Sequence, residues 1–485
     1  MNIPLLVIKL QGKRIGVLFE FTLENAQPII RFAVDEDYAR AAFGTLPTLS
    51  ESFRSGDPAQ QQSFWLNRVD PAFNAITGNK GDLQLPTFFQ NLLPEGAFRR
   101  HVSEDAGIAP DDNFRLLAAC GKDLSGAVTA EWEDIGRDAL QDLITQGQDA
   151  LEVTVWAEPF QDAISISGVQ PKLGVNKDAT GHFVGRTKHH DTSVIAKLPS
   201  AEYPRMPQME DLSMRLAQLT GVNTCGFELA EMDALGAGHR YDLGREATGY
   251  FLAVTRFDRG ADGRVHFEDF AQVLGIAPER KYSLSYAQIA LTLLALPKCG
   301  VPAVHELLRR IEVNELLGNA DMHLKNLGLI YRDQRDAELA PAYDILSTHV
   351  YLGTQGHALA LLDEQEKAAR DPREPLLRPR SMLQFCNALG IEVKLAIQVV
   401  RDTAKAAVSA WLEPILAAEI TPTQRHALLR RLFDHPHFLS ALRRREEYLQ
   451  QKWNRALQMA EQQAEREPSR KATAPDMSDV SAVSP

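Results

Sequence analysis

A short polar segment, GNADMHLKN at residues 318–326, constrains the fold more than any other feature of the chain. Residues 302–318 before it have the apolar spacing of an amphipathic helix, and residues 327–344 after it have the pattern of a strand hairpin. The segment crowds together an acid, an imidazole, an amine and an amide, namely Asp321, His323, Lys325 and Asn326. A plain connection between two core elements does not need such groups, so the segment predicts a site on a rigid scaffold.

The length and amino-acid composition are those of a globular protein. The chain has 485 residues, of which 44% are hydrophobic and 24% charged, so it can form several domains around a large core. The net charge of −12 argues against a large nucleic-acid-binding face. That charge still permits a basic partner, or a small basic pocket for phosphate.

Cysteine spacing and terminal patterns indicate the compartment. The 4 cysteines lie far apart without a CxxC pair, so we expect neither a zinc site nor a disulfide framework, but buried thiols in a reducing cytosol. The opening MNIPLLVIKLQGKRIG is typical of a strand and turn rather than a signal peptide. No run of about 18 apolar residues occurs, so we expect a cytoplasmic protein without membrane spans or a membrane partner.

Patterning divides the chain into four regions. Residues 1–148 start with two strands around the turn Gln11-Gly12-Lys13 and continue with helices. Residues 149–258 are rich in strands, and residues 259–464 are mostly helical. Residues 465–485 have the composition of a disordered tail. The expected helices are 37–43, 88–106, 112–119, 283–297, 302–318, 381–388, 393–417, 422–432 and 438–463, with a further helix in PQMEDLSMRLAQLTG that ends at Gly221.

Two carboxylates and an amide around the polar segment suit phosphoryl transfer. Asp321 and Asn326 have the spacing D-x-x-x-x-N, and Asp344 follows the hairpin in LAPAYDILS. In kinase-type catalysis such an Asp accepts the proton of the substrate hydroxyl, while the Asn and a later Asp hold Mg²⁺. The bare spacing occurs by chance about once in a chain this long, so its place between helix and hairpin gives it weight. In the alternative, Asp321 caps a helix and His323 is a structural histidine.

The stretch TSVIAKLPS places Lys197 in an apolar strand. A buried ammonium is costly unless it finds anions, and the α- and β-phosphates of a nucleotide would supply them. Glu210, in the helix that follows, would orient the lysine as an ion-pair partner. The alternative is an edge strand, in which the lysine stem packs while the ammonium reaches water.

A third stretch, SISGVQPKLGV at residues 165–175, places Gly168 in a turn between two strand-like halves. Its small residues would let backbone N–H groups approach phosphates. The stretch is neither a Walker loop nor the G-x-G-x-x-G of ordinary protein kinases, and alone it is a common hairpin. The order of the pieces along the chain matches a kinase fold. We therefore expect an α+β, two-lobed, protein-kinase-like fold, with a β-rich N-terminal lobe that carries an extra N-terminal domain and a mostly α-helical C-terminal lobe.

The sequence resembles the HipA family of serine/threonine kinases, the toxins of bacterial type II toxin–antitoxin pairs. The segments SISGVQPKLGV, VIAKLPS, LAVTRFDR, EDFAQVLG, GNADMHLKNLGLIY and LAPAYDILS resemble that family's signatures in order, and FFQNLLPEG and DDNFRLLAACGKDLSGAV resemble its N-terminal domain. The resemblance covers roughly residues 3–430. One departure is Thr255, where the family often has an acidic residue before Arg-Phe-Asp.

The resemblance implies a role for each matching residue. Asp321 would be the catalytic base, Asn326 and Asp344 the magnesium ligands, and Glu210 the residue that orients Lys197. The expected ATP contacts are Lys197, Ser167, Gly168, Val169, Gln170, Lys172, Arg256, Phe257, His323 and Lys325, with the backbone at Arg256 and Phe257 as the adenine hinge. Autophosphorylation of Ser165, or of Ser167, would inactivate the enzyme, because phosphoserine charge disfavours the loop pose that cradles ATP.

The resemblance also implies partners. It predicts a HipB-like helix-turn-helix antitoxin, so that DNA is contacted only through that partner, and a protein substrate, for which the family's example is an aminoacyl-tRNA synthetase. Two other functions stay open: a co-repressor module that acts with the antitoxin on DNA, and a small-molecule kinase on a similar scaffold.

Other polar clusters have simpler interpretations. His189 and His190 beside Asp191 favour an exposed turn over a metal site. His435 and His437 flank a proline and predict a loop between helices. The run Arg443–Arg445 is followed at once by two glutamates, which is typical of a surface ion-pair face.

Overall fold

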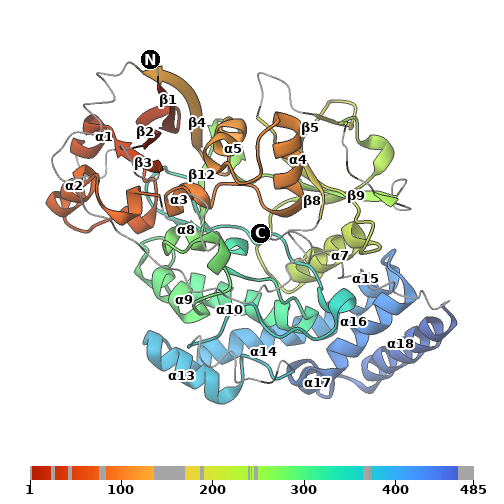
Figure 1. The fold of residues 1–485 in the computed structure, drawn as a ribbon. Coiled ribbons are helices and arrows are strands. Elements are labelled where there is room, and N and C mark those ends of the chain that lie inside the picture. Colours follow the sequence, from red (N-terminus) through yellow and green to blue (C-terminus); the bar gives the residue numbers. More distant parts are fainter. Residues whose placement is uncertain are drawn as a thin grey trace, which may run out of the picture.

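The computed structural model describes residues 3–22, 28–41, 46–75, 84–135, 170–185, 191–238, 241, 243–244, 249–363, 371 and 373–467. Sheets and short helices from the first half of the chain lie above a thick layer of long helices from the second half (Figure 1). The α+β class is confirmed, with a β-rich N-terminal part and a helical C-terminal part. Among the described residues, no helix is long and apolar enough to cross a membrane.

The N-terminal part is built on a four-stranded antiparallel sheet. Its strands, in the order β3-β2-β1-β4, are β3 (Pro28–Val34), β2 (Lys13–Thr22), β1 (Ile3–Leu10) and β4 (Val128–Ile135). The β1–β2 hairpin is confirmed at its predicted turn, where Gln11 and Gly12 have φ values of 54° and 74°. Two consecutive positive φ angles are what a two-residue hairpin loop requires.

Short helices pack on one face of this sheet. They are α1 (Glu36–Arg40), η1 (Glu51–Phe53), α2 (Pro58–Leu66), η2 (Pro71–Phe73), α3 (Thr87–Gln90), α4 (Gly96–Ala106) and α5 (Asn113–Cys120). The single helix expected over 88–106 is wrong, because α3 and α4 are separated by a segment that contains Pro94, which has no N–H to continue a helix. Helix α4 stops before Gly107, as predicted, with that glycine at φ 64°.

The second sheet has five strands in the order β6-β5-β7-β9-β8, each antiparallel to its neighbours. The strands are β5 (Lys172–Lys177), β6 (Phe183–Gly185), β7 (Val194–Lys197), β8 (Phe227–Glu231) and β9 (Tyr250–Thr255). Helix α7 (Met206–Leu219) packs against this sheet, where Met209, Leu212 and Leu216 join Leu252 and Val254 in one buried cluster. The sheet and α7 together hold one side of the candidate site.

Two small sheets connect this part to the helical layer. The strands are β10 (Arg259–Gly260), β11 (Gly263–Arg264), β12 (His266–Asp269), β13 (Gly328–Tyr331) and β14 (Glu338–Leu339). The hairpin expected over residues 327–344 is confirmed by the pairing of β13 with β14.

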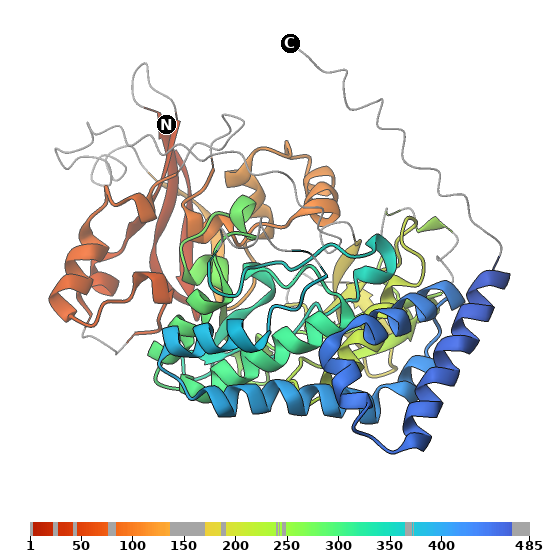
Figure 2. The ribbon, with the colours of Figure 1, turned by 90° about the horizontal axis from the view of Figure 1, so that it is seen from below.

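The helical layer surrounds α10 (Gly300–Leu317). Its other helices are α8 (Phe270–Val273), η5 (Pro278–Arg280), α9 (Tyr286–Ala295), η6 (Leu324–Asn326), α11 (His349–Leu352), α13 (Pro379–Leu389), α14 (Val393–Ala410), α15 (Leu412–Ala417), α16 (Pro422–Asp434), α17 (Pro436–Leu442) and α18 (Glu447–Arg466), and a short η3 (Met232–Ala234) follows β8. Seen from below, α10 in green runs beside α14 in blue, with the last helices stacked at one end (Figure 2).

Three expectations for the C-terminal helices are wrong in detail. Residues 393–417 form two helices, because the chain turns at Trp411 and Pro414 lies in the first turn of α15, where a missing N–H costs little. Residues 438–463 belong to α17 and α18. The disordered tail expected over residues 465–485 is wrong at its first two residues, since α18 continues to Arg466, and residues 468–485 lie outside the described part.

Candidate active site

The ammonium of Lys197 lies at the centre of the site. Lys197 ends β7, the middle strand of the five-stranded sheet, and is 6% exposed. Its Nζ forms ion pairs with the carboxylates of Glu210, on α7, and Asp344. The predicted Lys197–Glu210 pairing therefore exists, and the edge-strand alternative is wrong for this position. Burial alone would lower the pKa of Lys197, but Asp344 and Glu210 raise it above its ordinary value, so the lysine stays charged.

A second lysine stands beside the first. Lys172 on β5 is the register partner of Lys197 on β7, and both line the same cavity. Burial lowers the pKa of Lys172, although the nearby Asp344 acts in the opposite direction. Two amines on adjacent strands therefore line the same cavity as the carboxylate of Asp344.

The glycine-containing stretch is only partly described. Ser165, Ser167, Gly168 and Val169, which the sequence analysis assigned to ATP contacts and autophosphorylation, lie outside the described residues. Gln170, the next expected contact, is 2% exposed, and its Nε2 donates to the carbonyl of Leu198 at 3.4 Å.

The polar segment after α10 folds back on itself. Helix α10 ends at Gly318, whose φ is 67°. The side chain of Asn319 accepts a hydrogen bond from the backbone N of Asp321 at 3.0 Å, and Asn326 Nδ2 donates to the carbonyl of Asp321 at 2.7 Å. These bonds hold Asp321 from both sides, as positioning of a reacting group requires.

The carboxylate of Asp321 contacts an aromatic hydroxyl that the sequence did not single out. Tyr282 Oη donates a hydrogen bond to Asp321 Oδ1, and His323 Nε2 lies 3.5 Å from the same oxygen. The Tyr282 and His323 rings meet edge to face, with centroids 4.9 Å apart. Tyr282 lies about forty residues before Asp321 in no recognisable motif, so no sequence signal marked it.

His323 does not behave as a satisfied structural histidine. It is 1% exposed, and among the described residues neither ring nitrogen has a hydrogen-bond partner. Burial lowers its pKa, so the ring is neutral at neutral pH. His323 also lines the cavity, so its buried ring lies between the cavity and the carboxylate of Asp321.

Asp344 occupies an unusual backbone conformation. Its φ is 57°, a left-handed value that an aspartate adopts at some cost and that clusters at functional sites. Burial raises the pKa of its carboxyl, but Lys197 and Lys172 outweigh that effect and lower the pKa to about 2. The ionised carboxylate and the Asn326 side chain both line the cavity, and oxygens of these two types are the ligands that Mg²⁺ prefers.

The cavity has a volume of about 640 Å³, within the usual range for small-molecule sites. Eight of the expected site residues line it: Lys172, Lys197, Arg256, Phe257, His323, Lys325, Asn326 and Asp344. Asp321 and Glu210 are not among the lining residues and lie behind His323 and Lys197, which they contact. A second cavity, of about 620 Å³, lies away from these groups between the first helices and the β13–β14 turn.

The N-terminal part supplies the opposite wall of the site. Lys325 Nζ lies 2.8 Å from the carbonyl of Asn91, 3.2 Å from Asp269 Oδ2 and 3.6 Å from Glu95 Oε1. Lys281 Nζ lies 2.8 Å from Glu95 Oε2. Burial raises the pKa of Glu95, yet Lys325 and Lys281 lower it to about 2. The ammonium of Lys325, an expected ATP contact, is therefore paired with the carboxylates of Asp269 and Glu95.

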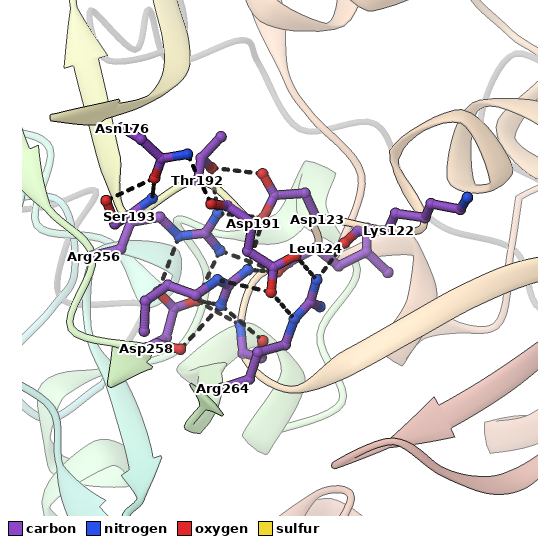
Figure 3. Close-up of polar contacts among 12 residues, drawn as sticks. Lys122, Asp123, Leu124, Asn176, Asp191, Thr192, Ser193, Arg256, Asp258 and Arg264 are labelled. Atoms are coloured by element: carbon purple, nitrogen blue, oxygen red, sulfur yellow. Dashed lines mark hydrogen bonds and ion pairs between the residues drawn. The ribbon is translucent and has the colours of Figure 1, made fainter. Parts of the chain in front are cut away.

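The expected adenine hinge contains Arg256, whose side chain is ion-paired, and Phe257, whose ring packs against other aromatic rings. Arg256 ion-pairs with Asp123 and Asp258, each at 2.9 Å, within a network that Figure 3 shows reaching Asp191 and Arg264. The neighbouring Phe257 lines the cavity and packs against Phe267 and Tyr343, with ring centroids 5.2 and 5.7 Å away. The Arg256 guanidinium is therefore held by carboxylates, and Phe257 is an aromatic residue of the cavity wall.

Most of the chain matches known protein families. Residues 6–131 match the HipA N-terminal domain family, and residues 164–411 match the HipA-like C-terminal domain family. A protein of Sinorhizobium fredii named "Putative kinase Y4dM" is 32% identical over 415 residues, which cover 84% of this chain and 92% of that protein. This chain belongs to the HipA family.

More distant HipA relatives also match along most of the chain. The "Serine/threonine-protein kinase toxin HipA" of Shewanella oneidensis is 25% identical over 391 residues, covering 74% of this chain and 82% of that protein. A solved structure from the same organism, of HipA with HipB and its operator DNA, matches with a TM-score of 0.62 at 21% identity and covers 95% of this chain and 99% of that one. This match supports the same fold.

The two HipA family regions meet at the cavity. Asn91, Glu95 and Asp123 come from the N-terminal match, whereas the paired lysines, Asn326 and Asp344 come from the C-terminal match. Helices α15 to α18 lie beyond residue 411, where the C-terminal match ends.

Proposed function

We propose that this chain is a Mg-ATP-dependent serine/threonine protein kinase and the toxin of a bacterial HipA/HipB-like toxin–antitoxin pair. The observation that carries the proposal is the buried ammonium of Lys197 between the carboxylates of Glu210 and Asp344, in the middle strand of a sheet and at the wall of a cavity. A lysine, an orienting glutamate and a metal-binding aspartate are the parts that protein kinases use to place nucleotide phosphates.

The nucleotide would bind in the cavity that Lys172, Lys197 and Asp344 line. Phe257 would contact the adenine, and Lys197 and Lys172 would contact the phosphates. Asn326 and Asp344 would hold Mg²⁺, which neutralises phosphate charge when bound. This donor set fits the ion, because Asp344 is ionised and the Nδ2 of Asn326 is used internally, which leaves its oxygen free to face the cavity.

The chemical step assigns one role to Asp321. As the hydroxyl oxygen of a substrate serine or threonine attacks the γ-phosphorus and ADP leaves, Asp321 accepts the hydroxyl proton. Tyr282 and the Asn319–Asn326 bonds would hold that carboxylate in place. The same reaction on Ser165, or on Ser167, would add negative charge to the glycine-containing stretch that precedes β5 in the sequence and would inactivate the enzyme.

The proposed partners follow from the relatives. The Shewanella structure holds HipA in a complex with HipB and its operator DNA. By analogy, a HipB-like helix-turn-helix antitoxin would bind this chain and connect it to operator DNA. The net charge of −12 favours such indirect DNA contact over a direct one. The substrate would be a host protein whose phosphorylation stops growth, with aminoacyl-tRNA synthetases as the first class to test.

The test is phosphate transfer by the purified full-length chain. After incubation with Mg-ATP, intact mass and phosphopeptide mapping should find one phosphate on Ser165 or Ser167 of the wild type. Asp321→Asn should lower the rate at least 100-fold, since it removes the proton acceptor. The matched control is Asp262→Asn, which changes an exposed aspartate in the β10–β11 turn and should leave the rate unchanged.

Growth provides the second readout. Expression of the wild type without an antitoxin should arrest growth, and Asp321→Asn should relieve the arrest while circular dichroism shows an intact fold. Arrest that persists in a folded Asp321→Asn variant would contradict the kinase mechanism and would favour a binding function.

A further inference from the structure

A second cluster of metal-binding side chains lies away from the cavity, between α10 and the junction of α16 with α17. It consists of Glu312 on α10, His435 at the junction and His437 in the first turn of α17. One carboxylate oxygen and one ring nitrogen from each histidine all lie within 4.8 Å of one another. The loop expected around the two histidines is therefore wrong, because His435 is the single residue between two helices and His437 is helical.

The polar atoms of this cluster are buried without enough partners. His435 is 2% exposed, and neither of its ring nitrogens has a hydrogen-bond partner among the described residues. Glu312 is 0% exposed and its Oε1 also has no partner in the part of the chain that the structure describes. The contact that remains joins Glu312 Oε2 to His437 Nδ1 at 2.9 Å. Buried imidazoles and carboxylates normally have partners, so these free atoms require an explanation.

The chemistry of the three side chains suits ligation. An imidazole binds a metal through the lone pair of an unprotonated ring nitrogen, and a carboxylate binds through an oxygen. Both ring nitrogens of His435 and Oε1 of Glu312 lack a partner among the described residues, so these atoms are not committed to another contact there.

We infer that Glu312, His435 and His437 bind a divalent transition metal, with zinc as the ion that fits best. Two imidazoles and one carboxylate are an established zinc ligand set, which leaves a fourth position for water or for another side chain. Calcium and magnesium prefer oxygen ligands alone, so two nitrogen ligands disfavour them. The absence of CxxC pairs does not count against this site, because it uses no cysteine.

A neighbouring carboxylate supports the cluster. Glu315 lies three residues after Glu312 on α10, and its Oε2 is buried without a partner among the described residues. Its other oxygen accepts a hydrogen bond from the backbone N of Leu376 at 2.5 Å and lies 3.5 Å from His357 Nε2. Burial raises the pKa of Glu315 to about 7, and repulsion from Glu312 is the second largest cause of this rise. A cation at the cluster would relieve that repulsion, and groups of this kind orient the ligands of metal sites.

The position of the site suggests a structural role. Glu312 lies six residues before Gly318, where α10 ends and the segment with Asp321 begins. His435 and His437 lie beyond residue 411, where the family match ends. A metal ion there would fasten the C-terminal helices to the helix that leads into the candidate active site. This role is independent of the proposed kinase function.

The test measures zinc on the full-length protein. Purified wild type, loaded with zinc and dialysed against metal-free buffer, should retain about one zinc per chain by mass spectrometry, and its thermal unfolding midpoint should fall after treatment with a chelator. Cobalt(II) should give the visible absorption of a four-coordinate site.

Variants separate the cluster from adventitious binding. His437→Ala removes the most accessible ligand, whose side chain is 23% exposed, and should fold while binding zinc at least tenfold more weakly. His435→Ala should do the same. The control is His305→Ala, which removes a partly exposed histidine of α10 outside the cluster and should leave zinc binding unchanged.

Either of two results would overturn the inference. One is a wild type that retains no zinc. The other is a pair of folded variants, His435→Ala and His437→Ala, that retain zinc as tightly as the wild type does. In either case Glu312 and His437 would be an ordinary buried ion pair.

Discussion

At the scale of single residues, the site is defined by charges that are buried together. Lys197 is 6% exposed and faces two carboxylates, so its burial is compensated on both sides. An isolated ammonium at the same place would lose its proton or remain in water. The compensation makes Lys197 a structural residue as well as the proposed phosphate contact.

Removing that ammonium should therefore destabilise the fold. Lys197→Met leaves Glu210 and Asp344 buried without their cation, and breaking a buried ion pair from one side costs about 3–5 kcal/mol. Chemical denaturation should show this loss in the free energy of unfolding. The matched control is Lys177→Met on β5, whose pair with Glu228 is exposed, and it should change that free energy by no more than about 0.5 kcal/mol. Equal effects of the two variants would contradict the compensation argument.

The hydroxyl of Tyr282 should matter for the rate, because it holds the carboxylate of Asp321 in place. Tyr282→Phe removes one hydrogen bond to the Asp321 carboxylate, and such bonds to charged groups contribute about 1.5–3 kcal/mol. We expect initial rates of Mg-ATP-dependent phosphorylation to fall roughly 10- to 100-fold.

Tyr351→Phe is the control for that rate. It removes a hydroxyl that donates to the carbonyl of Pro204, away from Asp321, and should leave the rate unchanged. A Tyr282→Phe variant as active as wild type would mean that Asp321 is positioned by its backbone bonds alone.

At the scale of elements, the end of α10 decides where the polar segment begins. Gly318 has a φ of 67°, and a Cβ added there would lie 2.7 Å from His349 Cβ. Only glycine meets both constraints, because the left-handed conformation and the close approach each disfavour a side chain. This single position sets the direction of the chain toward Asp321.

Gly318→Ala should therefore cost more than the same change at another helix end. The left-handed backbone accounts for about 1 kcal/mol, and the contact with His349 adds about 1–3 kcal/mol. The control is Gly390→Ala after α13, where φ is 65° and no atom lies within 4 Å of the added Cβ. Denaturation midpoints of the two variants give the comparison, and equal losses would show that the loop at His349 moves aside.

Much of this element structure could be predicted from periodicity. The β1–β2 hairpin, α10 and the β13–β14 hairpin follow from alternation, helical spacing and turn residues. The break at Trp411 was missed because the apolar stripe continues across it. The break at residues 443–446 was missed because Arg and Glu are good helix formers, so the sequence there does not show a change of direction. At such places tertiary packing decides the boundary.

The residues of the site also fall into two groups, those that the sequence marks and those that only the folded structure reveals. Lys197, Glu210, Asn326 and Asp344 have neighbours in sequence that mark them, and the structure brings them together. Lys281 and Tyr282 join the site from a segment without a motif, and Glu95 comes from FFQNLLPEG, to which the sequence analysis gave no role in the site. Only the folded chain shows that contact, as it does for His435 and Glu312.

At the scale of the whole molecule, polar contacts join the N-terminal part to the rest. Asp123 forms ion pairs with Arg256 (Figure 3) and with Arg259. Glu95 forms an ion pair with Lys281, and the backbone N of Glu51 donates a hydrogen bond to Glu268. The cavity lies beside the contacts at Asp123 and Glu95, so its shape depends on how the two parts are joined.

The contact at Glu268 should make stability depend on pH. Glu268 is fully buried and accepts hydrogen bonds from Ser50, Glu51 and Tyr331. Burial raises its pKa from 4.5 to about 8, although those donors act in the opposite direction. Between these values the folded protein holds a proton that the unfolded chain releases. The contribution to stability is therefore complete below pH 4.5 and falls by up to about 1.4 kcal/mol per pH unit until about pH 8.

Glu268→Gln should remove that slope, because its amide does not titrate. The measurement is the free energy of unfolding of wild type and variant at intervals from pH 5 to pH 8. Glu202→Gln, a change at an exposed glutamate, should leave the slope as it is. Parallel curves for wild type and Glu268→Gln would mean that the buried carboxyl is ionised in the folded state.

The shared wall of the cavity has a consequence for how such proteins diverge. Because Asn91, Glu95 and Asp123 face residues some 130 to 230 positions later in the chain, neither part can be exchanged freely with that of a relative. A chimera that takes its first 131 residues from another family member should recover a native cavity only when the acidic partners of Arg256, Lys281 and Lys325 arrive with them. The two parts should then be inherited together, because their charged residues must match each other. Recombination between distant members should therefore be rare at the boundary between the two parts.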